Sequence, residues 1–292
     1  MPNPLRVWVS AMRPRTLPAA ISPVIAGSAI AAHDHRFNPA AAGLCAVFAL
    51  LVQVGTNFAN DYYDFVHGAD TSSRIGPRRA VASGLVSPAA MRRAMAAMFA
   101  AAFLSGLGLI HWGGPWMLAV GLASIACGVA YTGGPYPLAY HGLGDVFVFI
   151  FFGLVAVTVT YFVQALRVSA HALLAGASMG LLSANILLVN NYRDMETDAA
   201  AGKKTLVVRL GRRFARAQFA VSMVVAFAIA VAFAATGYGL GCLLPLVLVP
   251  VAVAHVRRLT PAGTPPQFVA LLGDTAKLMA AYAVLFAAGI LI

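Results

Sequence analysis

The stretch LCAVFALLVQVGTNFANDYYD, residues 44–64, decides the fold of this chain. It begins as a long apolar run and ends with two carboxylates and two carboxamides, within NFANDYYD at 57–64. A run of this kind is typical of a helix that crosses a membrane, but the polar end is unusual because buried acidic groups are costly there. NNYRDMETD at 190–198 repeats the pattern after another apolar run.

The composition supports an all-α polytopic membrane protein. The chain has 292 residues, of which 61% are hydrophobic and 10% are charged, whereas soluble domains carry roughly 25% charged residues. A large soluble core would still need a polar surface, and a membrane β-barrel would show short alternating segments rather than long apolar runs.

We expect about nine transmembrane helices. The predicted spans are Leu17–Ala32, Ala40–Ala59, Ala94–Ile110, Pro115–Tyr131, Val146–Phe162, Ala172–Val189, Phe214–Ala235, Leu240–Ala254 and Ala276–Ile292. Several are shorter than the roughly 20 residues that a span needs, so these helices should extend into their flanks.

The distribution of Lys and Arg predicts the orientation. With a cytoplasmic N-terminus, 18 of the 20 basic residues face the cytoplasm and only Arg36 and Arg167 face the other side. This arrangement places both polar stretches on the cytoplasmic face, and we expect a multi-pass protein of a bacterial cell (inner) membrane.

The two polar stretches resemble each other. Aligning NDYYD at 60–64 with NNYRD at 190–194 matches Asn60 with Asn190 and Asp64 with Asp194, and a basic cluster follows each. Each stretch also ends the second span of a possible four-helix group. We therefore expect a single domain, 1–292, with two similar halves at about 1–143 and 144–292 whose polar stretches meet.

Each polar stretch forms a stripe on one helix face at 100° per residue. The stripes comprise Gln53, Asn57, Asn60, Asp61 and Asp64, and Ser183, Asn190, Asn191, Asp194 and Asp198. Six of the nine acidic residues lie within 61–70 and 194–198. One such motif alone would be an ordinary solvated helix end, but two matching motifs favour a functional site.

Clustered carboxylates with basic residues close behind favour a Mg²⁺–diphosphate site. Mg²⁺ takes one or two carboxylates and fills its other positions with water and phosphate oxygens, and Arg and Lys can hold the phosphate. The candidate cations are Arg74, Arg78, Arg79, Lys203 and Lys204. Their alternative explanation is the positive-inside bias. A diphosphate site beneath apolar helices suggests an isoprenoid diphosphate substrate.

Two further segments lie on the same side. YTGGPYPLAYHGLGD at 131–145 is an irregular loop whose aromatic Tyr131, Tyr136 and His141 can cover the site, or form an interfacial aromatic belt together with Tyr140. RPRTLPAA at 13–20 carries Arg15 and Thr16, beside Arg13, and can either contact an anionic acceptor or anchor the chain at the membrane surface.

At these residues the chain resembles the UbiA-type intramembrane prenyltransferases, and most closely the branch that prenylates 1,4-dihydroxy-2-naphthoate in menaquinone biosynthesis. The similar stretches are RPRTLPAA, NFANDYYDFVHGADT, RIGPRRAVASGLVS, YTGGPYPLAYHGLGD and NNYRDMETDAAAGKKTLVVRLG, over residues 13–211. The resemblance implies nine transmembrane helices around a central cavity with a lateral opening to lipid. Asp70 departs from the wider family's spacing, because it follows Asp64 by six residues rather than four.

The resemblance also implies an enzyme, a Mg²⁺-dependent transferase. It would move a polyprenyl group from an allylic polyprenyl diphosphate to 1,4-dihydroxy-2-naphthoate with loss of CO₂, giving demethylmenaquinone. By position, the metal–diphosphate residues are Asn60, Asp61, Asp64, Asn191, Asp194 and Asp198, with Arg79 and Lys203 on the diphosphate and Tyr131 near the reacting carbon. Asp61 or Asp198 would take the acceptor proton. The partners are the two substrates and the bilayer, and no nucleic acid.

Two alternatives remain open on the sequence. The acceptor can be another aromatic compound, such as 4-hydroxybenzoate or haem. A cation-coupled membrane transporter would also use repeated halves and intramembrane Asp residues, but its carboxylates should lie near the membrane midplane.

Overall fold

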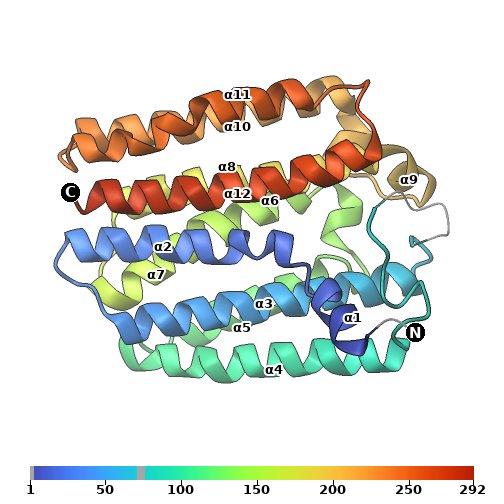
Figure 1. Cartoon of the computed structure of the whole chain (residues 1–292). Coiled ribbons are helices and arrows are strands. Elements are labelled where there is room, and N and C mark those ends of the chain that lie inside the picture. Colours follow the sequence, from blue (N-terminus) through green and yellow to red (C-terminus); the bar gives the residue numbers. More distant parts are fainter. Residues whose placement is uncertain (1–2, 71–75) are drawn as a thin grey trace.

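The computed structural model describes residues 3–70 and 76–292, and this part of the chain is helical with no strand (Figure 1). The helices are α1 (Pro4–Ala11), η1 (Pro14–Thr16), α2 (Pro18–His33), α3 (Pro39–Val66), α4 (Pro88–Gly113), α5 (Met117–Ala130), η2 (Leu138–His141), α6 (Gly144–Phe149), η3 (Ile150–Val155), α7 (Ala156–Ala165), α8 (Ala170–Arg193), α9 (Met195–Ala200), α10 (Leu206–Ala235), η4 (Leu240–Leu248), α11 (Val249–Arg258) and α12 (Pro265–Ile290).

Each predicted span falls on a helix of the structure. Among the described residues, seven helices are long and apolar enough to cross a membrane, the bent pair Pro4–Thr16 and Pro18–His33 gives an eighth, and the shorter apolar α5 corresponds to the remaining prediction. The segments α6, η3 and α7 form one continuous span, Gly144–Ala165, with a π-helical turn in its middle. The protein is a multi-pass membrane protein.

Most of the long helices extend beyond their predicted spans, and for α3 and α12 the sequence explains the difference. The helix α3 continues seven residues beyond Ala59, because its polar end is buried rather than solvated. The helix α12 starts at Pro265 instead of Ala276, after a Thr264–Gln267 capping box and with proline in its first turn. Lys277, the second residue of the predicted span, therefore lies midway along α12 rather than at its start.

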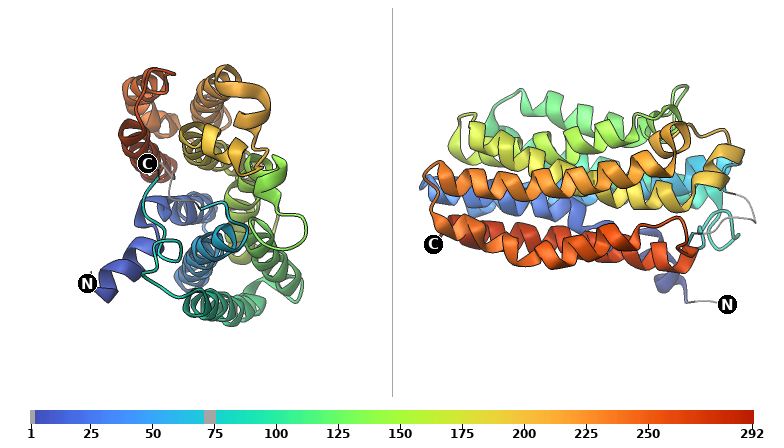
Figure 2. Two further views of the ribbon diagram at one scale, coloured as in Figure 1. Left: turned by 90° about the vertical axis from the view of Figure 1, so that its right-hand side faces the viewer. Right: turned by 90° about the horizontal axis from the view of Figure 1, so that it is seen from above.

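The long helices run side by side, so their ends gather at two ends of the bundle (Figures 1 and 2). We call the end that carries Asp64 and Asp194 the motif end. The helix α3 packs against α4, α8 packs against α10 and α12, and α2 lies between α12 and α7. The span Gly144–Ala165 approaches α8 closely: a Cβ built on Gly180 would lie 2.5 Å from the carbonyl oxygen of Phe149.

A polar cluster fastens the opposite end of the bundle. Asp34 follows α2 and accepts hydrogen bonds from the Tyr161 hydroxyl (2.6 Å) and from the guanidinium of Arg167 (2.5 Å). Partial burial raises the pKa of Asp34, but the hydrogen bonds from Tyr161, Arg167 and His33 outweigh it, so the net pKa is lowered. The cluster ties α2 to α7 and to the segment before α8.

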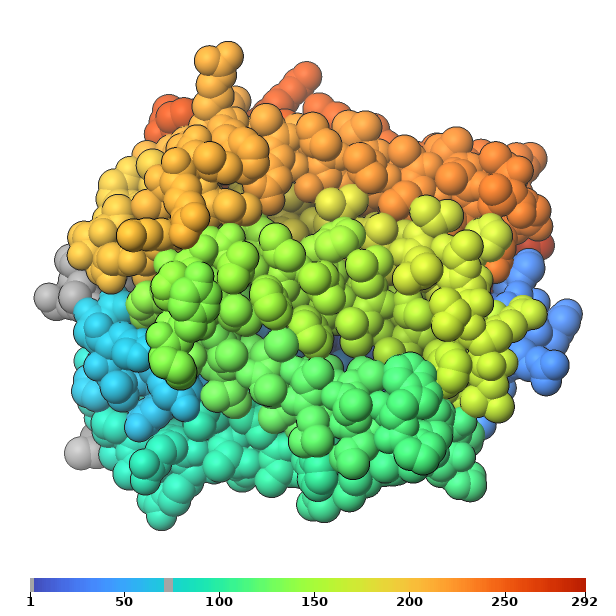
Figure 3. Space-filling model, turned by 180° about the vertical axis from the view of Figure 1, so that it is seen from behind, coloured from blue at the N-terminus to red at the C-terminus, as the bar shows by residue number. Residues whose placement is uncertain are grey.

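A large pocket opens from the middle of the bundle toward its side. Both α5 and the span Gly144–Ala165 line it. The surface is hollowed between these two elements (Figure 3). The lining reaches from Asp64 at the motif end of α3 to Cys45, and these residues are about 28 Å apart along the helix at 1.5 Å per residue.

Candidate active site

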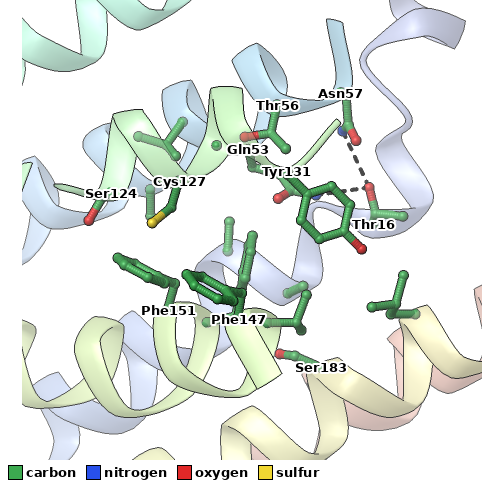
Figure 4. Close-up of a pocket in the computed structure, with 18 of the residues that line it drawn as sticks. Thr16, Gln53, Thr56, Asn57, Ser124, Cys127, Tyr131, Phe147, Phe151 and Ser183 are labelled. Carbon is green, nitrogen blue, oxygen red and sulfur yellow. Dashed lines mark hydrogen bonds between the residues drawn. The ribbon is translucent and has the colours of Figure 1, made fainter. Parts of the chain in front are cut away.

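Acidic and basic side chains line the motif end of the pocket, and its walls are mostly apolar. Figure 4 shows part of the lining. Tyr131 projects into it beside Thr16, while Phe147, Phe151 and Ser183 lie on the other side. The predicted site residues that line it are Thr16, Asn60, Asp64, Arg79, Tyr131, Asn191, Asp194, Asp198 and Lys203. Both polar stretches therefore face one chamber, as their similarity predicted.

Asp64 is the centre of the motif end. It is 2% exposed, and its carboxylate contacts Lys203 Nζ (2.8 Å), an Arg79 guanidinium nitrogen (3.2 Å) and the donating hydroxyl of Tyr140 (2.9 Å). Lys203 also lies over the Tyr140 ring, 4.7 Å from its centroid. A residue of the first polar stretch is thus joined to a cation that follows the second stretch.

Arg79 connects Asp64 with Asp70, the residue whose spacing departs from the family pattern. Its Nε lies 3.3 Å from an Asp70 carboxylate oxygen, and the Asp70 side chain is fully buried. Asp70 can therefore orient Arg79 beside Asp64.

The second motif has its own buried cation. Arg193 is 3% exposed and donates to both carboxylate oxygens of Asp194 (2.7 and 2.6 Å) and to Asn190 Oδ1 (2.9 Å). Such a bidentate pair fixes the orientation of the carboxylate. The sequence predicts Arg193 only as one of the basic residues on the cytoplasmic side. Its position next to Asp194 does not indicate that its side chain is buried.

Asp61 does not have the position expected of it. It is 2% exposed and is not among the residues that line the pocket. Its two oxygens accept hydrogen bonds from the backbone N–H groups of Ala80 (3.1 Å) and Val81 (3.0 Å). We therefore assign Asp61 to holding the segment that carries Arg79, rather than to metal binding or proton transfer.

Other predicted residues also lie outside the lining. They are Arg15, Arg78 and Lys204, which are exposed, and Tyr136 and His141, which stack on each other with ring centroids 3.6 Å apart. The prediction for Arg74 falls outside the described residues. Tyr140, for which the aromatic belt was the simpler explanation, contacts Asp64 instead.

The two tyrosines of the motif end are held protonated. Burial, followed by the charges of Asp145 and Asp64, raises the pKa of Tyr131, and burial, followed by the charge of Asp64, raises the pKa of Tyr140. The Tyr140 hydroxyl can therefore act as a donor to Asp64 at neutral pH. Tyr131 presents an uncharged, electron-rich ring to the pocket.

The donor set fits a metal that arrives together with a diphosphate. Within residues 3–70 and 76–292, no three acidic, His or Cys side chains are grouped so that they could hold a metal ion by themselves. Mg²⁺ usually takes one or two carboxylates and fills its other positions with phosphate and water. Asp64, Asp194 and Asp198, with the carboxamides of Asn60 and Asn191, offer the hard oxygen atoms that this mode needs.

These features define a class: an all-helical membrane protein whose pocket suits an amphiphilic substrate with an anionic head. A model of the UbiA prenyltransferase family matches residues 20–271. The chain therefore belongs to the UbiA prenyltransferase family and is a prenyltransferase. It is 39% identical to a 1,4-dihydroxy-2-naphthoate octaprenyltransferase from Mycobacterium tuberculosis over 94% of each chain. It is 35% identical to one from Haemophilus influenzae, over 99% of this chain and 96% of that one.

Solved structures share the fold. A UbiA homolog from Aeropyrum pernix without ligand superimposes with a TM-score of 0.69 at 19% identity, covering 94% of this chain and 96% of that one. A UbiA homolog from Archaeoglobus fulgidus bound to GPP and Mg²⁺ gives 0.65 at 14% identity, covering 96% and 99%. The all-helical architecture predicted from the sequence is confirmed.

Proposed function

We propose that this protein transfers a polyprenyl group from an allylic polyprenyl diphosphate to 1,4-dihydroxy-2-naphthoate, with loss of CO₂, to give a demethylmenaquinone-type product. The observation that carries the proposal is the contact of Asp64 with Lys203, because it joins the two motifs at the end of an apolar pocket that opens sideways. The relatives that bear the naphthoate octaprenyltransferase name supply the acceptor.

The residues of the motif end would receive the diphosphate. Arg79 and Lys203 flank Asp64, so a diphosphate that enters here meets two cations and a carboxylate at one point. Asp64, Asp194 and Asp198 would hold Mg²⁺, with Asn60 and Asn191 beside them. Mg²⁺, when bound, would supply positive charge that stabilises the leaving diphosphate.

The remaining residues would guide the transfer. The isoprenoid tail would lie along the apolar walls, and the allylic carbon would face Tyr131, whose ring can stabilise developing positive charge. The apolar lining excludes water from that carbon. The C–O bond of the diphosphate breaks and a C–C bond to the naphthalene ring forms. The carboxylate leaves as CO₂, and its bonding electrons stay on the ring, so a quinol forms without an added oxidant.

We also infer the two-half organisation and the orientation. The helices α3 and α8 end together at the motif end, and each packs against the long helix that follows it, α4 or α10. The predicted excess of basic residues at this end supports a cytoplasmic site and N-terminus. Asp64 and Asp194 lie at an end of the bundle rather than near its middle, which favours the enzyme over the transporter.

An acceptor panel tests the proposal. Purified protein is incubated with one polyprenyl diphosphate and with 1,4-dihydroxy-2-naphthoate, 4-hydroxybenzoate or haem, with Mg²⁺ or after exhaustive EDTA treatment, and products are identified by mass spectrometry. We expect a decarboxylated product from the naphthoate alone, only with Mg²⁺. Asp64→Ala and Asp194→Ala should abolish it while the protein stays monodisperse. Full activity after EDTA treatment, or a preference for another acceptor, would contradict the proposal.

A further inference from the structure

The backbone is strained where the N-terminal segment enters α2. Arg13 has φ 53° and ψ 67°, in the left-handed region that residues with a side chain rarely adopt. Strain of this kind persists only where surrounding contacts impose it, and it gathers at functional sites.

Side chains on both sides of the turn impose the strain. The Asn57 amide donates to the carbonyl oxygen of Met12 (2.9 Å), and the Thr16 hydroxyl donates to the carbonyl oxygen of Arg13 (3.0 Å). The Gln53 amide in turn donates to the Thr16 hydroxyl oxygen (3.2 Å). Figure 4 shows Gln53, Asn57 and Thr16 together on one side of the pocket. Gln53 and Asn57, the residues of the α3 polar stripe that lie farthest from Asp64, therefore hold the turn at Arg13.

Arg13 is part of the pocket lining, as are Thr16 and Tyr131. The other lining cations of the described chain, Arg79 and Lys203, contact Asp64 and come from segments behind the two acidic motifs. Arg13 comes from a different segment, in front of α2. The N-terminal segment thus adds a third cation to the pocket lining.

We propose that Arg13 binds the carboxylate of the aromatic acceptor, and that Asn57, Thr16 and Gln53 are positioning residues that keep Arg13 in place. The inference rests on the proposed function and names the group that selects a carboxylated ring. A guanidinium can grip a carboxylate through two parallel hydrogen bonds, while the ring lies against Tyr131. A site built on such a pair discriminates strongly against a ring that lacks the carboxylate.

Equilibrium binding tests the proposal without turnover. The probes are 1-hydroxy-2-naphthoate and 1-naphthol, followed by their fluorescence in nanodiscs with the protein and in empty nanodiscs. The test variant is Arg13→Gly, because glycine adopts the observed φ without strain and folding should be preserved. We expect about 10- to 100-fold weaker binding of the naphthoate, which is the value of a charge-assisted pair, and unchanged binding of 1-naphthol. Arg6→Gln, at an exposed arginine of α1, is the matched control and should change neither.

Kinetics separate this proposal from the proposed function. In Arg13→Gly and Asn57→Leu the KM for the acceptor should rise about 10-fold or more, while the KM for the prenyl diphosphate stays within about twofold. An unchanged naphthoate preference in Arg13→Gly, a rise in the diphosphate KM instead, or the same effect from Arg15→Gln would each overturn the role of Arg13. If wild-type protein binds the naphthoate through Arg13 but forms no prenylated product, the proposed function fails and this inference stands.

Discussion

Asp61→Asn is the substitution that best distinguishes a metal ligand from a residue that positions the site. The change is nearly isosteric, but it replaces one carboxylate oxygen by an NH₂ group. In the structure both oxygens accept backbone N–H groups, from Ala80 and Val81, in a buried environment. An asparagine can accept only one of them, and its NH₂ group then faces the other N–H.

The magnitude follows from these two bonds. A hydrogen bond to a charged group contributes about 1.5–3 kcal/mol, and a buried N–H left without a partner costs about 1–3 kcal/mol. The ordered conformation of the segment at 79–81 should therefore lose about 2–4 kcal/mol. Since about 1.4 kcal/mol corresponds to a factor of ten, its population relative to open conformations falls at least about 30-fold. This segment carries Arg79, which contacts Asp64 at 3.2 Å.

The assay measures three quantities in wild type and in each variant. They are the KM for the prenyl diphosphate, kcat, and the Mg²⁺ concentration that gives half-maximal rate. In Asp61→Asn we expect the KM to rise about 10-fold or more and kcat at saturating diphosphate to change by less than about threefold. Limited trypsin cleavage after the exposed Arg78 should be faster. Asp64→Asn should show no turnover at any diphosphate concentration. Asp274 forms a partly exposed ion pair with Arg258, and Asp274→Asn should behave as wild type.

The reasoning would be refuted if Asp61→Asn abolished turnover at saturating diphosphate, as Asp64→Asn does, or raised the Mg²⁺ requirement while trypsin cleavage stayed at the wild-type rate. Either result would make Asp61 a metal ligand.

Three further changes probe other parts of the molecule. Lys203→Met removes the cation 2.8 Å from Asp64 and should raise the KM for the diphosphate about 10- to 100-fold, whereas the same change at the exposed Lys204 should have little effect on steady-state kinetics. Gly180→Ala forces a Cβ against the Phe149 carbonyl and should destabilise the protein by about 1–3 kcal/mol in thermal unfolding, whereas Gly43→Ala, with open space around it, should not. The pKa of Asp34 is lowered in the folded state, so its stabilising contribution is present above the ordinary pKa of Asp, about 3.9, and is lost as pH falls through the folded-state value. The difference in melting temperature between wild type and Asp34→Asn should therefore shrink as pH falls below about 4, and a constant difference would contradict this assignment.

The sequence predicts the helices well because their signals are local. Long apolar runs place all the spans, and N-caps such as Asn38, Ser87 and Thr205 mark where several helices begin. The Thr264–Gln267 pair is also a local signal, and it would have placed the start of α12 correctly. The meeting of the two motifs was predicted because their similarity is visible along the chain.

The exact partners in the site depend on distant segments, which no local pattern shows. Asp61 and Asp64 share one helix face in the sequence, yet one binds backbone N–H groups of the 79–81 segment and the other faces the pocket. Tyr136 and Tyr140 share one irregular loop, and only Tyr140 meets Asp64. The loop is rich in proline and glycine and has no regular periodicity. The direction in which each tyrosine side chain points could therefore not be predicted from the sequence.

On the proposed function, the hollow between α5 and the Gly144–Ala165 span would let a polyprenyl diphosphate enter the pocket from the surrounding lipid. Encounter then occurs in two dimensions, so the rate should follow the mole fraction of polyprenyl diphosphate in the membrane rather than its amount per volume of buffer. Adding inert phospholipid at a fixed total quantity of both reactants would slow the enzyme by dilution alone. A side entrance would also let the far end of a long tail remain in the lipid, so the rate should depend little on tail length beyond the part that the pocket holds.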